Sequence, residues 1–141
     1  MIVYAESSAV LSWLFGEPPG GEVRGTLEAA EFVVTSDLTL VECDRAFHRA
    51  RTLGELSSER FAMLRGELRH LAEGWVLLRL SHEIVERSRD DFPEGPIRTL
   101  DALHLASVLN TVTLVPETTL LSHDERVRRC AQALGLRVLP P

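Results

Sequence analysis

The chain has 141 residues, of which 45% are hydrophobic and 26% are charged, and its formal net charge is −6. Residues 1–141 are expected to form a single domain around one core, in the cytoplasm, because no apolar run approaches the roughly 18 to 20 residues that cross a membrane. The negative balance excludes nucleic-acid binding through a generally basic surface, but it leaves room for a local basic rim around an acidic pocket that holds a cation.

Short β-rich runs alternate with helical stretches along the whole chain. The expected strands are residues 2–5, 31–35, 75–80, 119–122 and 136–139. The expected helices are residues 8–15, 22–30, 38–53, 58–72, 82–90, 100–109 and 124–134. This alternation predicts the α/β fold class: a three-layer α/β/α sandwich with a central, mostly parallel sheet.

Acidic side chains stand where the predicted strands end or where helices begin. Glu6 follows the first strand, Glu42 lies early in the helix after the second strand, and Asp101 and Asp124 lie in the first turns of later helices. Ligands of open α/β sheets bind at the carboxyl ends of the strands, so these acids are expected to gather there. A hard divalent cation relieves the repulsion among such carboxylates and supports attack of an activated water on a phosphodiester bond.

The same acids also have a structural interpretation. Acids in a first helical turn stabilise the helix dipole, and Thr39-x-x-Glu42 and Ser122-x-x-Glu125 both fit a capping box. If Thr39 were the N-cap, Glu42 would be used in capping. Thr99 is likewise expected to cap the helix that carries Asp101. The sequence leaves both interpretations of Glu42 open.

Four short stretches, in this order, resemble PIN-domain ribonucleases, in particular the VapC toxins of bacterial toxin–antitoxin pairs. The stretches are residues 2–9 (IVYAESSA), 36–42 (SDLTLVE), 98–106 (RTLDALHLA) and 120–126 (LLSHDER). Each is weak alone, whereas together they cover nearly the whole chain. The resemblance implies a PIN-like fold, RNA cleavage with Mg²⁺ or Mn²⁺ (tRNA being one candidate substrate), a homodimer, and inhibition by a VapB-like antitoxin.

By position, Glu6, Glu42, Asp101 and Asp124 match the metal-binding, catalytic acids of that family. Glu6 stands where the family has Asp, and it carries one extra methylene group. A shift of about 1 Å in a catalytic group can lower a rate by ~100-fold. Two hypotheses therefore stay open: a metal-dependent endoribonuclease, and a catalytically weakened or inactive PIN fold that acts as a binding module.

Further polar residues near these acids are candidates for substrate binding. Ser8 and Ser122 can orient a carboxylate or meet the substrate, although either can instead cap a helix. Arg45, Arg49 and Arg98 can contact RNA phosphates, with a solvated or ion-paired surface as the alternative.

His104 follows Asp101 by three residues and so shares its side of the predicted helix. Its neighbours are apolar, and this context favours packing over a role in the reaction.

Overall fold

The computed structural model describes residues 1–141. Its five strands form a single sheet. The strands are β1 Ile2–Ala5, β2 Phe32–Ser36, β3 Val76–Leu78, β4 Thr119–Leu121 and β5 Arg137–Leu139. Every neighbouring pair is parallel, and the spatial order is β3-β2-β1-β4-β5. The chain leaves β1 toward β2 on one side and returns to β4 on the other. The carboxyl end of β1 is therefore the point where the strand order reverses, which is where ligands bind in open α/β sheets.

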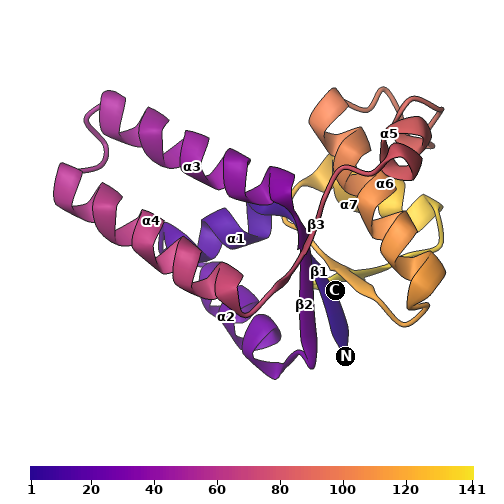
Figure 1. Ribbon diagram of the computed structural model, residues 1–141, viewed down its shortest axis with the longest axis horizontal. Helices are drawn as coiled ribbons and strands as arrows, with labels where there is room; N and C mark the ends of the chain where they lie inside the picture. The colour runs from indigo at the N-terminus through magenta and orange to yellow at the C-terminus, as the bar shows by residue number, and fades with distance from the viewer.

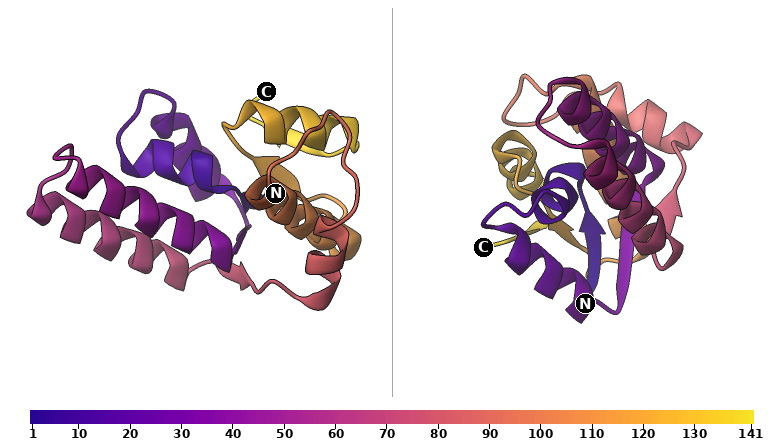
Figure 2. Two further views of the ribbon diagram at one scale, coloured as in Figure 1. Left: turned by 90° about the horizontal axis from the view of Figure 1, so that it is seen from above. Right: turned by 90° about the vertical axis from the view of Figure 1, so that its left-hand side faces the viewer.

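Helices cover both faces of this sheet, as the alternating pattern predicted. They are α1 Ser7–Leu14, α2 Gly20–Ala29, α3 Asp37–Thr52, α4 Ser58–Glu73, α5 His82–Ser88, α6 Thr99–Leu114 and α7 Glu125–Ala133. Figure 1 shows α3 and α4 as an antiparallel pair that extends away from one side of the sheet, while α5, α6 and α7 lie on the other side. The turned views in Figure 2 show the same division. The fold is a PIN-like α/β/α sandwich.

Alternate residues of the central strands enter different cores. Val3 and Ala5 belong to the larger cluster, with α1 to α4, whereas Tyr4 between them belongs to the smaller cluster, with α6 and α7. Leu121 and Leu120 divide in the same way. Successive side chains of a strand point to opposite faces, so a strand covered on both faces must be apolar at nearly every position. This requirement explains the short continuous apolar runs of the sequence.

Helix α6 differs from its prediction at both ends. Thr99 is not its N-cap: Arg98 holds that position and makes no side-chain capping bond. The helix also runs to Leu114, beyond the expected end at residue 109. The hydroxyls of Thr111 and Thr113 donate to carbonyls one turn earlier, at 2.9 and 3.0 Å, so these polar residues are accommodated within the helix instead of ending it.

None of the helices combines the length and the apolar character that crossing a membrane requires.

Candidate active site

Glu6 lies directly after β1 and is almost completely buried, with 4% of its surface exposed. Three hydroxyl groups donate to its carboxylate. Ser7 Oγ donates to Oε1 at 2.6 Å, Ser122 Oγ donates to Oε2 at 2.8 Å, and Ser8 Oγ also donates to Oε2. A buried carboxylate needs such partners to offset the loss of water. The side chain of Glu6 is thus fixed in place from both the start of α1 and the end of β4.

Ser8 and Ser122 join Glu6 to the start of α7. Ser8 Oγ accepts from the backbone N–H groups of His123 and Asp124 at 2.9 and 3.1 Å, and Ser122 Oγ accepts from the N–H of Asp124 at 3.1 Å. Ser122 has no exposed surface. Its hydroxyl therefore serves to hold Glu6 and the following turn.

The alternative capping box at Ser122 and Glu125 does not form. Asp124 is the N-cap of α7, and its Oδ1 accepts from the N–H groups of Arg126 and Val127 at 2.9 and 3.2 Å. Capping needs only one carboxylate oxygen here. The second oxygen, Oδ2, remains directed to the site, where it meets Arg98 at 3.2 Å.

The alternative capping box at Thr39 and Glu42 does not form either. Helix α3 begins two residues earlier, after the N-cap Ser36, whose hydroxyl accepts from the N–H of Leu38 at 3.1 Å. Thr39 is buried inside the helix and bonds to Thr35 at 2.8 Å. Because the cap is made elsewhere, the carboxylate of Glu42 is available for the site.

Asp101 and Asp124 are bridged by one guanidinium group. Arg98 donates from Nε to Asp101 Oδ2 at 2.9 Å and from Nη2 to Asp124 Oδ2 at 3.2 Å. The hydrogen bond to Asp101 is the main reason why the pKa of Arg98 is raised above its usual value. The Asp101 side chain is mostly buried, whereas that of Arg98 is 61% exposed. The arginine therefore covers the acids from the solvent side.

His104 lies between two acids, a contact that the sequence did not predict. Its Nε2 lies 2.5 Å from Glu42 Oε1 and 3.9 Å from Glu6 Oε1, while its Nδ1 lies 3.0 Å from the hydroxyl of Tyr4. The ring is 1% exposed. The three-residue spacing from Asp101 was the available signal, but the apolar neighbours outweighed it. Tyr4, within an apolar strand, gave no signal.

A hollow of about 380 Å³ opens beside these groups and is lined by Glu42, Arg98, Thr99, Leu100 and Asp101. Two of the four predicted acids therefore face a space that can admit a phosphate group. Glu6 is more deeply buried, and Asp124 contacts Arg98 outside this lining.

The donor set fits a hard divalent cation by its chemistry. Four carboxylates reach this edge of the sheet, and carboxylate oxygens are the ligands that Mg²⁺ prefers. The structure has no group of three His, Cys, Asp or Glu side chains spaced to hold a metal ion. In its place, one cationic side chain, Arg98, bridges Asp101 and Asp124, and His104 contacts Glu42.

Arg45 and Arg49 lie apart from the acids, further along α3. With His48, Thr52 and Leu53 they line a separate hollow of about 400 Å³. Neither arginine forms an ion pair. The structure thus brings Arg98 to the acids and leaves Arg45 and Arg49 as free cations on an adjoining surface.

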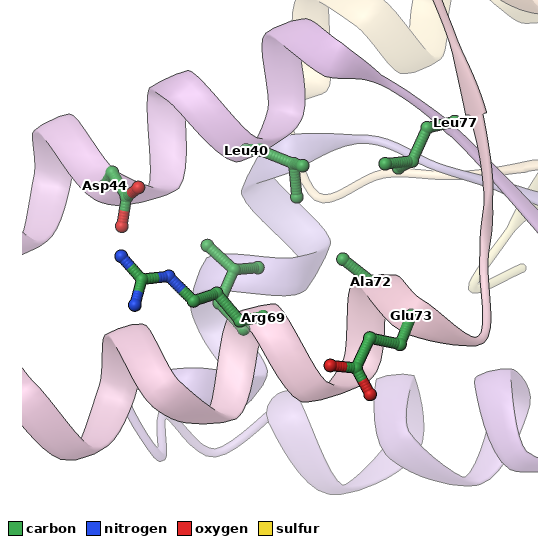
Figure 3. Close-up of a pocket in the computed structure, with 7 residues that line it drawn as sticks. Leu40, Asp44, Arg69, Ala72, Glu73 and Leu77 are labelled. Atoms are coloured by element: carbon green, nitrogen blue, oxygen red, sulfur yellow. The ribbon is translucent and has the colours of Figure 1, made fainter.

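The largest hollow of the molecule, about 540 Å³, lies between α3 and α4, away from the acids. Figure 3 shows Leu40 and Asp44 on one side of it, Arg69 and Glu73 on the other, and Leu77 at its end. Its mixed apolar and charged lining carries none of the four acids, so it is a separate surface feature.

The fold agrees with the sequence comparisons. Residues 3–133 match the sequence profile of the PIN domain, so the chain belongs to the PIN-domain family. Within that family its relatives include two from Mycobacterium tuberculosis. It is 32% identical to ribonuclease VapC46 and 27% identical to ribonuclease VapC35, in each case over 99% of this chain and 97% of the relative. The chain is thus VapC-like over its full length.

Solved structures support the fold independently. The structure of VapC20 from Mycobacterium tuberculosis, described as a toxin that cleaves the sarcin-ricin loop, superimposes with a TM-score of 0.68 at 15% identity and covers 95% of each chain. A chain of VapBC2 from Rickettsia felis, bound to a promoter DNA fragment, gives a TM-score of 0.67 at 12% identity and covers 98% of this chain and 97% of that one.

Proposed function

We propose that this chain is a divalent-cation-dependent endoribonuclease in which Glu6, Glu42, Asp101 and Asp124 hold Mg²⁺ or Mn²⁺. That it is a VapC-like PIN-domain ribonuclease toxin follows from its family and its full-length relatives. The cation dependence rests on one observation. A single exposed guanidinium bridges Asp101 and Asp124, which marks this spot as one where positive charge is stabilised.

The residues of the chain divide the work of the proposed reaction. When bound, the cation supplies activation of water and neutralisation of the phosphoryl charge. Ser8 and Ser122 keep Glu6 in one orientation through their hydrogen bonds. Arg98, which is exposed, would be free to pair with a phosphate oxygen of the RNA if the acids held a cation.

Arg45 and Arg49 are proposed to bind the RNA backbone away from the cleaved bond. Arg49 is seven residues beyond Glu42 on α3, or about 10 Å along the helix. At that distance Arg49 would meet a neighbouring phosphate instead of the reacting one. Free guanidinium groups suit this role because they bind phosphate through two parallel hydrogen bonds.

The chain is proposed to act as a single domain, residues 1–141, in the cytoplasm and as a homodimer restrained by a VapB-like antitoxin. The support is its likeness to toxin chains from toxin–antitoxin complexes, among them VapBC2 from Rickettsia felis. RNA, including tRNA, is the proposed substrate class.

Replacement of Asp101 tests the proposal. Asp101→Asn keeps the size of the side chain but removes its negative charge, so RNA cleavage and growth arrest on expression should both be lost. Glu67→Gln, at an exposed position of α4, removes a charge elsewhere and should leave both unchanged. If Asp101→Asn cleaves RNA as fast as the wild type, the assigned site is wrong.

A further inference from the structure

Tyr4, His104 and Glu42 form a buried chain of polar contacts that the proposed reaction does not itself require. The chain joins three elements that lie far apart in the sequence: β1, α6 and α3. Tyr4 has no exposed surface, and the His104 side chain is 1% exposed, whereas the Glu42 side chain is 23% exposed. The contacts therefore lead from the core outward to an acid that lines the hollow of the active site.

The direction of these hydrogen bonds follows from the chemistry of the phenol group. The hydroxyl of Tyr4 carries its proton at neutral pH and is therefore a donor. It can then donate to His104 Nδ1 at 3.0 Å. A neutral imidazole that accepts at Nδ1 carries its hydrogen on Nε2. Nε2 then donates to Glu42 Oε1, and the two atoms are 2.5 Å apart.

We propose that His104, oriented by Tyr4, is a positioning residue that fixes the carboxylate of Glu42 for cation binding. The inference rests on the proposed function, because it assigns Glu42 a cation to hold. The side chain of Glu42 lines the hollow and is partly exposed, so it could adopt other rotamers. A single charge-assisted hydrogen bond from the buried His104 ring restricts it. Partners of this kind orient ligating side chains, and their loss lowers metal affinity by about 10- to 100-fold.

His104 also keeps Glu42 and Glu6 in a fixed relation. The same Nε2 that contacts Glu42 lies 3.9 Å from Glu6 Oε1. The longer side chain of Glu6, held by its three hydroxyl partners, is what reaches this position. The ring thus sets the orientation of one acid against another that is already fixed.

Two substitutions of His104 separate positioning from packing. In His104→Gln the amide extends to about where Nε2 lies and can still donate to Glu42. In His104→Asn the shorter amide ends near Nδ1, so it can meet Tyr4 but not Glu42. The measurement is Mn²⁺ affinity, read from the electron paramagnetic resonance signal of free Mn²⁺, which does not depend on RNA cleavage.

Positioning predicts that His104→Gln binds Mn²⁺ within about threefold of the wild type, while His104→Asn binds about 10-fold more weakly or worse. Equal losses in the two variants, or wild-type affinity in His104→Asn, would overturn the inference. If neither variant folds by circular dichroism, Tyr4→Phe replaces them. It should fold and bind Mn²⁺ several-fold more weakly, because the ring is then free to turn, and unchanged affinity would again overturn the inference.

Asp101→Asn separates this inference from the proposed function beneath it. If the wild type does not bind Mn²⁺, or if Asp101→Asn binds it equally well, the proposed function fails and the positioning role fails with it. If both behave as proposed and His104→Asn still binds like the wild type, only the positioning role fails.

Discussion

Replacing Glu6 by the aspartate usual in the family is predicted to lower the stability of this protein and its rate of RNA cleavage. Glu6→Asp withdraws the carboxylate by about 1.5 Å, the length of one carbon–carbon bond. The bond from Ser122, now 2.8 Å, would lengthen to roughly 4 Å, beyond hydrogen-bond range. Ser7 is the next residue in the chain and can follow the carboxylate more easily. The hydroxyl of Ser122, at the end of β4, cannot.

The expected cost can be worked from these contacts. A hydrogen bond to a charged group contributes about 1.5 to 3 kcal/mol, and a buried methylene about 0.8 kcal/mol. Loss of the Ser122 bond and of one methylene therefore lowers the free energy of unfolding by about 2 to 4 kcal/mol. For a domain of this size the melting temperature should fall by roughly 6 to 12 °C.

Urea unfolding followed by circular dichroism measures this cost. In Glu6→Asp the urea concentration at the midpoint should fall, while the slope of the unfolding free energy against urea concentration stays the same. The control Glu67→Asp, on an exposed helical surface, should stay within about 0.5 kcal/mol of the wild type. Ser122→Ala should cost less in the Glu6→Asp background than alone, by about 1 kcal/mol or more, because the bond is already lost there.

RNA cleavage by Glu6→Asp should also be slower, since the carboxylate moves away from Glu42. Wild-type stability together with faster cleavage would refute the reasoning. It would show that Glu6 weakens an ordinary PIN site, as the sequence left open, and that the serine contacts do not depend on the longer side chain.

Two further predictions concern the arginines. Arg98→Gln removes the cation that bridges two acids, so Mn²⁺ affinity measured by calorimetry should rise while RNA cleavage slows; weaker Mn²⁺ binding would show that Arg98 does not compete for the site. The double variant Arg45→Gln/Arg49→Gln should weaken RNA binding and reduce the slope of log affinity against log salt by about 1.4, the value for two phosphate contacts to a single strand. Arg137→Gln, on the edge strand β5, removes one charge elsewhere, and half the effect of the double variant there would show only the loss of general charge.

The sequence predicted the parts of this site that depend on local pattern. Alternating strands and helices determine that the sheet is parallel, and a parallel sheet brings the residues after its strands to one edge. Asp101 and Asp124 could therefore be assigned to one region from spacing alone. Glu42 followed as well, although Thr39 offered a competing cap that the structure does not use.

The parts that the sequence could not predict depend on contacts between distant residues. Tyr4 and His104 are one hundred residues apart, and His104 and Glu42 are sixty-two apart. In each case the polar residue stands among apolar neighbours, so the local pattern indicates packing alone. The N-caps of α3, α6 and α7 differ from the candidates Thr39, Thr99 and Ser122 for a related reason. Several adjacent residues can each cap a helix, and the backbone path into the helix selects among them.

The most direct test of the central claim is RNA cleavage under single-turnover conditions by the wild-type protein, first treated with a chelator and then supplied with Mn²⁺. The account predicts no cleavage after chelation and recovery on addition of Mn²⁺. Cleavage that continues in the chelator would contradict the assignment of the four acids as cation ligands. Failure to cleave a broad set of RNAs with fresh Mn²⁺ would instead favour a PIN fold that only binds its partners.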